Sequence, residues 1–116
     1  MKSTTDVLDH HLKCFANRDI NGPMADYSAD AVFLGPEGAL LGPDAIRPAF
    51  ESFFAEFAKP GTSFARKQRL IAGNYAYVVW SSETADNFYE LASDTFFIQN
   101  GSIRMQAFTA KVTPKR

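Results

Sequence analysis

The sequence has little of several features that mark common classes of protein. Cys14 is its one cysteine among 116 residues, so no disulfide can form within the chain, which fits a reducing compartment. Twelve basic and thirteen acidic side chains leave a formal net charge of −1. Nucleic acids and anionic membranes are bound through a basic excess. The composition therefore predicts neither a nucleic-acid partner nor a membrane partner.

Long apolar runs are also missing. The first residues, MKSTTDVLDHH, have no apolar core of signal-peptide length, and no run approaches the ~18 apolar residues of a membrane-spanning helix. We therefore expect a cytoplasmic protein. No glycine-rich phosphate loop and no Cys/His set with zinc spacing occurs, and the adjacent His10 and His11 would point in different directions on a helix. We expect neither a cofactor nor a metal.

Aromatic residues are what the sequence has in abundance. Eleven are phenylalanine, and 46% of all residues are hydrophobic, enough for the core of a single domain over residues 1–116. In the first half, apolar residues at helical spacing predict a helix starting near Ser3 and a Phe-rich helix from Pro43 to about Ala58. A short helix over 23–27 and short strands at 31–34 and 40–41 are expected between them.

The second half of the chain has no helical period. Extended runs are predicted at 63–72, 75–86, 88–99 and 102–112. The last two flank Asn100-Gly101, the strongest short hairpin signal, because both central residues of that turn need positive φ. Helices followed by a strand meander predict an α+β fold. We expect a curved antiparallel sheet wrapped around about three helices as a cone, whose open mouth is suited to a small ligand.

Asp94 is the first candidate for chemistry. It alternates with Phe96 and Ile98, so the three side chains share one face of a strand. On a concave face, burial would raise the pKa of this carboxyl, and the protonated acid could donate a hydrogen bond to a developing oxyanion. The alternative is a solvated carboxylate near the end of the strand.

Three other polar residues have two interpretations each. His11 interrupts an apolar helical face, as a satisfied core histidine or as a donor or base in a pocket. Glu83 could form a coupled acid pair with Asp94, or lie exposed at a strand end. Glu37 could reach over the mouth of a pocket from its loop, or be an ordinary turn carboxylate in water.

One face of the 75–86 strand is too apolar to remain in water. Trp80 shares this face with Val78 and Ala76, and it lies opposite the face of Glu83. We expect this to be the outer sheet face and to be covered in a homodimer. Further residues assigned to it are Phe97, Met105 and Ala107.

The order of these segments resembles the nuclear transport factor 2-like superfamily, and within it the SnoaL-like and ketosteroid-isomerase-like group. The resemblance is carried by Asp6–Leu12, Ala29–Phe33, Leu41–Ile46 and Asp94–Phe108. It implies a cone-shaped α+β fold, dimers through the outer sheet face, and activities that range from isomerases and cyclases to proteins without catalysis.

The resemblance also assigns residues to positions of the isomerase group. Asp94 falls at the protonated oxyanion-hole aspartate, and His11 falls at the oxyanion tyrosine. Gly35 falls at the general-base aspartate, and Phe50 falls at a supporting tyrosine. Because glycine cannot abstract a proton, classical ketosteroid isomerisation is not expected.

These observations predict an apolar pocket that binds a small hydrophobic molecule. Catalysis, if present, would be cofactor-free proton transfer on a carbonyl compound, with Asp94 as oxyanion donor and His11 or Glu83 as base. The expected lining is Phe15, Tyr27, Phe33, Phe50, Phe54, Val79, Phe96, Gln106 and Phe108. The alternative is a non-catalytic dimerisation or protein-interaction module whose cavity is filled by its own rings. A void of ~300 Å³ or more would favour ligand binding.

Overall fold

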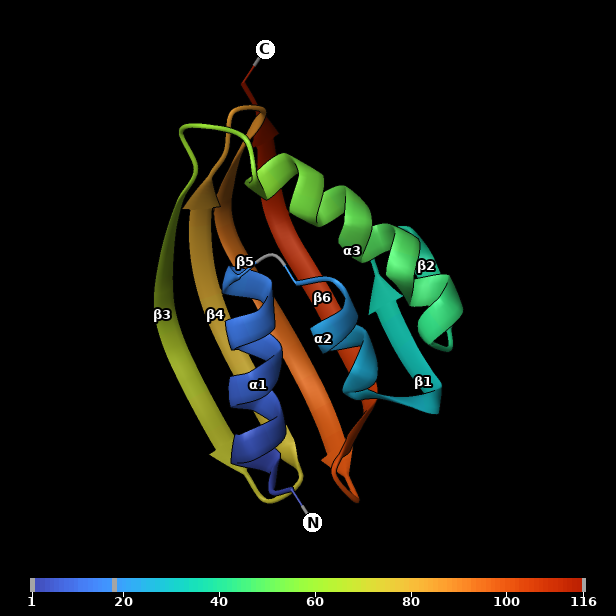
Figure 1. Ribbon diagram of the computed structural model, residues 1–116. Coiled ribbons are helices and arrows are strands. Elements are labelled where there is room, and N and C mark those ends of the chain that lie inside the picture. The colour runs from blue at the N-terminus through green and yellow to red at the C-terminus, as the bar shows by residue number, and fades with distance from the viewer. Residues whose placement is uncertain (1, 18, 116) are drawn as a thin grey trace.

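The computed structural model describes residues 2–17 and 19–115 as three helices and a six-stranded sheet (Figure 1). The first half of the chain contains α1 (Thr4–Ala16), α2 (Asn21–Ala25), β1 (Tyr27–Gly35), β2 (Gly38–Leu41) and α3 (Pro43–Phe57). The second half contains β3 (Ser63–Ala72), β4 (Tyr75–Glu83), β5 (Asn87–Gln99) and β6 (Ser102–Pro114). The predicted α+β class is confirmed.

The sheet is curved and unclosed, with the strand order β2-β1-β6-β5-β4-β3. The four long strands form the predicted antiparallel meander. The turn between β5 and β6 has positive φ at Asn100 (54°) and Gly101 (76°), as the Asn-Gly signal predicted. One pair departs from the expected antiparallel pattern, because β1 lies parallel to β6.

Helix α1 begins where the sequence provides a cap. Ser3 accepts a hydrogen bond from the backbone N–H of Asp6, and the Asp6 side chain accepts one from the N–H of Ser3, so two otherwise unpaired donors are satisfied. The helix lies over the concave face of the sheet in front of β4 and β5 (Figure 1). An ion pair between Asp9 and Arg69 joins it to β3. No helix among the described residues is long and apolar enough to span a membrane.

The strand register decides which side chains face the helices. Asp94 lies opposite Val78 on β4 and opposite Phe108 on β6, so these three side chains share the concave face. Trp80, two residues after Val78, lies on the same face and is 5% exposed. The expectation that Trp80, Val78 and Ala76 form an outer, dimer-forming face is therefore wrong.

The convex face carries the alternate residues of the same strands. Tyr75 lies opposite Phe97, which lies opposite Met105, and this row is partly open to solvent. Of the residues assigned to the outer face, Phe97, Met105 and Ala107 do lie there, and the tyrosines of β4 accompany them. The sequence therefore predicted the outer residues of β5 and β6 correctly, but it assigned the inner residues of β4 to the outer face.

Candidate functional site

Asp94 is held by two N–H donors on the concave face. The indole Nε1–H of Trp80 donates to Oδ2 at 2.9 Å, and the amide Nε2–H of Gln106 donates to Oδ1 at 2.9 Å. Burial raises the pKa of the Asp94 carboxyl, while these two hydrogen bonds and the nearby His11 oppose that rise. The acid is directed inward, as one of the two interpretations of the sequence had it.

A small cavity of about 70 Å³ surrounds this carboxyl. Most of its lining was predicted: His11, Phe15, Phe33, Phe50, Asp94, Phe96, Gln106 and Phe108. Leu12, Phe53, Phe64 and Trp80 complete it and were not predicted as lining. The cavity is mainly aromatic, with three polar side chains. It is too small to hold more than a fragment of a ligand.

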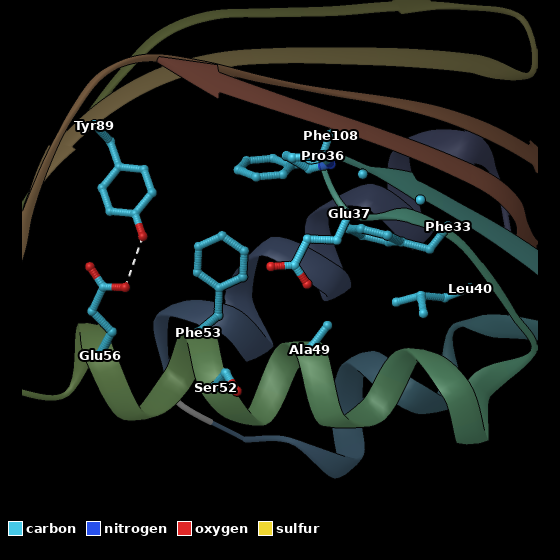
Figure 2. Close-up of a pocket in the computed structure, with 12 residues that line it drawn as sticks. Phe33, Pro36, Glu37, Leu40, Ala49, Ser52, Phe53, Glu56, Tyr89 and Phe108 are labelled. Carbon is cyan, nitrogen blue, oxygen red and sulfur yellow. Dashed lines mark hydrogen bonds between the residues drawn. The ribbon is translucent and has the colours of Figure 1, made fainter. Parts of the chain in front are cut away.

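A larger chamber of about 440 Å³ adjoins the small cavity. It lies between α3, the loop that joins β1 to β2, and the strands β5 and β6 (Figure 2). The rings of Phe33, Phe53 and Phe108 line both spaces, so they form a shared wall. The chamber is larger than the ~300 Å³ void that favours ligand binding, whereas the cavity at Asp94 is smaller.

Two carboxylates face the chamber. Glu37 lies in the β1–β2 loop with its carboxylate directed into the space (Figure 2). This position agrees with the first of the two interpretations of Glu37, in which it reaches over a pocket from its loop. Glu56, on the last turn of α3, accepts hydrogen bonds from Tyr89, Thr84 and Asn87 at 2.6–2.9 Å. Burial first, and then the bond to Glu56, raise the pKa of Tyr89. Both oxygens of Glu56 are thus occupied by hydrogen bonds within the protein, whereas the Glu37 carboxylate is available to a ligand.

A chain of hydrogen-bonding groups continues behind Asp94, away from the chamber. The Tyr27 hydroxyl donates to Oε1 of Gln106, and its oxygen lies 3.4 Å from Nε2 of His11. Nδ1 of His11 lies 3.3 Å from Oδ2 of Asp26. Among the described residues, no group of three or more His, Cys, Asp or Glu side chains is placed to hold a metal ion.

Asp26 was not singled out from the sequence, and His10 was considered only as a metal ligand. Nδ1 of His10 lies 2.8 Å from Oδ1 of Asp26, so both neighbouring histidines contact one carboxylate, whose side chain is 1% exposed. Asp26 follows the last residue of α2, a position at which a carboxylate is ordinarily solvated. Its burial arises from tertiary packing, in which His10 and His11 of α1 contact its side chain, and no local pattern in the sequence records that packing.

Four predicted site residues lie elsewhere. Val79 lies opposite Ser93 on the convex face, and its assignment to the lining is wrong because the register places the even-numbered residues of β4 inside. Glu83 lies opposite Phe88 and forms an ion pair with Lys115 at 2.6 Å, so it does not meet Asp94. Tyr27 and Phe54 are buried in the core but line neither of the two cavities.

Comparison of the fold gives many similar structures, and the three described here have low sequence identity. An NTF2-like protein of unknown function from Cytophaga hutchinsonii has a TM-score of 0.78 at 13% identity, over 96% of this chain and 92% of that one. A ketosteroid isomerase candidate from Kribbella flavida has a TM-score of 0.75 at 13% identity, over 93% and 77%. A polyketide cyclase candidate from Sinorhizobium meliloti has a TM-score of 0.72 at 16% identity, over 90% and 94%.

Comparison of the sequence is more specific about the family. No functionally curated protein matches the chain. The model of the SnoaL-like domain matches residues 8–105, which include α2, α3 and the first five strands, all but the start of α1, and the beginning of β6. This match agrees with the curved sheet and with the three helices on its concave side. The chain belongs to the SnoaL-like family, within the NTF2-like superfamily.

Proposed function

We propose that this domain binds a small, largely hydrophobic carbonyl compound and transfers a proton on it, with Asp94 as the group that exchanges the proton. The observation that carries the proposal is the Asp94 carboxyl itself, which opens into an aromatic cavity while Trp80 and Gln106 hold its two oxygens. A partly buried carboxyl with a raised pKa is suited to take a proton and to return it.

The hydrogen bonds refine the role of Asp94. Both oxygens accept N–H groups, which favours the carboxylate and therefore a base that removes a proton next to a carbonyl. Asp94 then becomes the acid that returns the proton to the enolate carbon or oxygen. Gln106 gives one of its two amide hydrogens to Asp94, and the second could hold the carbonyl oxygen of the ligand. These steps need only protein groups and no cofactor.

The chamber limits the charge of the ligand. Its described lining contains Glu37 and Glu56 and no lysine or arginine. A carboxylate-bearing ligand would be repelled and would leave its own charge unpaired, which is costly in an apolar space. We expect neutral ketones to bind better than matched keto acids. To reach Asp94 from the chamber, such a ligand must displace the Phe33, Phe53 or Phe108 ring, because these three rings form the shared wall.

Exchange of deuterium from solvent into a panel of enolisable aryl ketones, followed by NMR, tests the proposal. Asp94→Asn should lower the exchange rate by about 10²-fold or more, the usual contribution of a general base. Asp30→Asn, which alters an exposed aspartate, serves as the control. Equal rates for the wild type and Asp94→Asn would rule out proton transfer by this residue.

An alternative function has its own support on the convex face. The Tyr75 and Phe97 rings lie 5.2 Å apart there, and Tyr75 is 59% exposed. An aromatic sheet face of this kind is suited to a second copy of the chain, so a homodimer through this face is the expected assembly. If the protein dimerises but binds none of the ketones, a non-catalytic dimerisation module becomes the better description.

A further inference from the structure

We propose that the chamber binds the protonated amine of a hydrophobic ligand, with the Glu37 carboxylate as its counter-ion. This inference rests on the proposed function, because it names the charge carried by the ligand of the same site, and its test measures binding alone. The acidic lining that disfavours an anionic ligand also attracts a cationic one.

The Glu37 carboxylate has a charge that the protein does not balance. Glu37 is exposed in the β1–β2 loop, and its carboxylate is directed into the chamber (Figure 2). Among the described residues, none donates a hydrogen bond to this carboxylate or forms an ion pair with it. An ammonium group that enters the chamber can therefore make a charge-assisted hydrogen bond to Glu37 without displacing another partner.

Glu56 adds a second negative charge to the lining. Its described hydrogen-bond donors, Thr84, Asn87 and Tyr89, are neutral, so they hold the carboxylate in place without cancelling its charge. Lys59 lies close to Glu56 along the chain, but it is exposed and forms an ion pair with an aspartate of the β4–β5 turn. No lysine, arginine or histidine belongs to the described lining. Negative charge therefore faces the chamber from the β1–β2 loop and from α3.

The other walls of the chamber favour an organic ammonium over an inorganic cation. The rings of Phe33, Phe53, Tyr89 and Phe108 line the space, and the faces of such rings attract cations. An inorganic cation needs several oxygen ligands in place of its water, and the described residues contain no group of three or more His, Cys, Asp or Glu side chains placed to hold one. An amine on a hydrocarbon buries its apolar part against the rings, while its ammonium stays beside the exposed Glu37 and near water.

The size of the chamber fits one such molecule. Its volume of about 440 Å³ lies within the range of sites that hold drug-sized ligands. With the ammonium at Glu37, the apolar end of the ligand lies against the wall that Phe33, Phe53 and Phe108 share with the cavity at Asp94. An amino ketone, with the amine and the carbonyl at opposite ends, therefore satisfies both the charge of the chamber and the proposed role of Asp94.

Three matched compounds test the preferred charge of the ligand. Phenylbutylamine, phenylbutanol and phenylbutanoate share a ring and a chain length, and at neutral pH they are cationic, neutral and anionic. In NMR titrations, the amine should bind at least about 10-fold more tightly than the alcohol, and the acid should bind least. Shifts of the backbone amides of Gly35, Gly38 and Ala49, which line the chamber, locate the site. Added salt should weaken the binding of the amine selectively, because it screens exposed charges.

Variants separate the Glu37 carboxylate from the net charge of the protein. Glu37→Gln should lower the affinity for the amine about 5-fold and leave the affinity for the alcohol within about 2-fold. Glu51→Gln removes the same charge from an exposed position outside the lining, where Glu51 pairs with Arg47, and should change neither affinity. Glu37→Lys should reverse the order, so that the acid binds more tightly than the amine.

Several results would overturn the proposal. They are equal affinities for the amine and the alcohol, absence of amine binding, binding outside the chamber, and an unchanged affinity for the amine in Glu37→Gln. The proton-transfer proposal fails separately. If the amine binds as expected but Asp94→Asn leaves the deuterium exchange of ketones unchanged, only the proton transfer is refuted. If ketones exchange through Asp94 but the amine has no advantage, only the preferred charge is refuted.

Discussion

The hydroxyl of Tyr89 donates a 2.8 Å hydrogen bond to Oε1 of Glu56 and so joins β5 to the last turn of α3 (Figure 2). Thr84 and Asn87 donate to the other oxygen of the same carboxylate. One side chain therefore fixes the end of α3 against the β4–β5 turn, and with it one wall of the chamber.

Glu56→Gln tests this attachment. The amide can accept at only one of its two ends, so at least one donor loses its partner, and we expect the free energy of unfolding to fall by about 1–3 kcal/mol. Glu51→Gln, on the same helix but exposed and paired with Arg47, is the matched control and should change the free energy of unfolding by less than about 0.5 kcal/mol. Urea denaturation measures both. Equal losses would show that the Glu56 contacts contribute nothing specific.

The pH dependence of stability should carry a contribution from Asp94. Burial raises the pKa of its carboxyl above the ordinary value of 3.8, so the native state holds this proton more tightly than the unfolded chain does. The contribution is therefore favourable at low pH and is lost as the pH rises from 3.8 through the raised value. Each pKa unit corresponds to about 1.4 kcal/mol.

Asp94→Asn should remove that contribution. The difference in unfolding free energy, variant minus wild type, should become more favourable to the variant as the pH rises through this window. Asp30 provides the opposite control, since a hydrogen bond from Ser28 lowers the pKa of its carboxyl and Asp30→Asn should show no such trend. A constant difference between Asp94→Asn and the wild type would mean that Asp94 has an unperturbed pKa.

Gly22 is predicted to be intolerant of any side chain. A Cβ added there would lie 2.4 Å from the Cys14 sulfur and 2.9 Å from Oδ2 of Asp19. Gly22→Ala should therefore cost about 1–3 kcal/mol through overpacking. The same substitution in a Cys14→Ala background should cost less, with a coupling of about 0.5–3 kcal/mol in a double-mutant cycle. Additive losses would contradict the close contact of Gly22 with the sulfur.

The convex face should determine the oligomeric state. Sedimentation velocity of the wild type is expected to give the mass of a dimer, and Tyr75→Lys should shift it toward the monomer because a charge would enter the buried patch. Val112→Lys changes an exposed hydrophobic residue that lies in register with the inward-facing Tyr89, and it should leave the dimer intact. A monomeric wild type would refute the dimer, and an unaffected Tyr75→Lys dimer would place the interface elsewhere.

Local signals in the sequence accounted for most of the fold. The β5–β6 hairpin follows from Asn100-Gly101, whose φ angles are both positive, and the α1 boundary follows from the Ser3 cap. Strand spacing also placed Asp94, Phe96 and Ile98 together on one face of β5, although the run Phe96-Phe97-Ile98 is apolar on both faces and does not say which face turns inward.

The sides of β4 could not be predicted from its sequence. YAYVVWSSE is apolar on both faces, so alternation alone does not say which face turns inward. The register with β5 decides it, and an irregularity between Trp80 and Ser82 changes that register before Glu83. The inverted assignments of Val79 and Trp80 both follow from this one ambiguity. Asp26 was missed for a different reason, since its burial depends on tertiary packing.

The parallel pairing of β1 with β6 has a consequence for how the chain folds during synthesis. Phe33 is in register with Gln106, so an early strand cannot join the sheet until almost the entire chain has left the ribosome. The β3–β5 meander can assemble before that, and β6 then provides the edge to which β1 and β2 attach. Truncations that end before β6 should therefore leave the first two strands exposed and prone to aggregation.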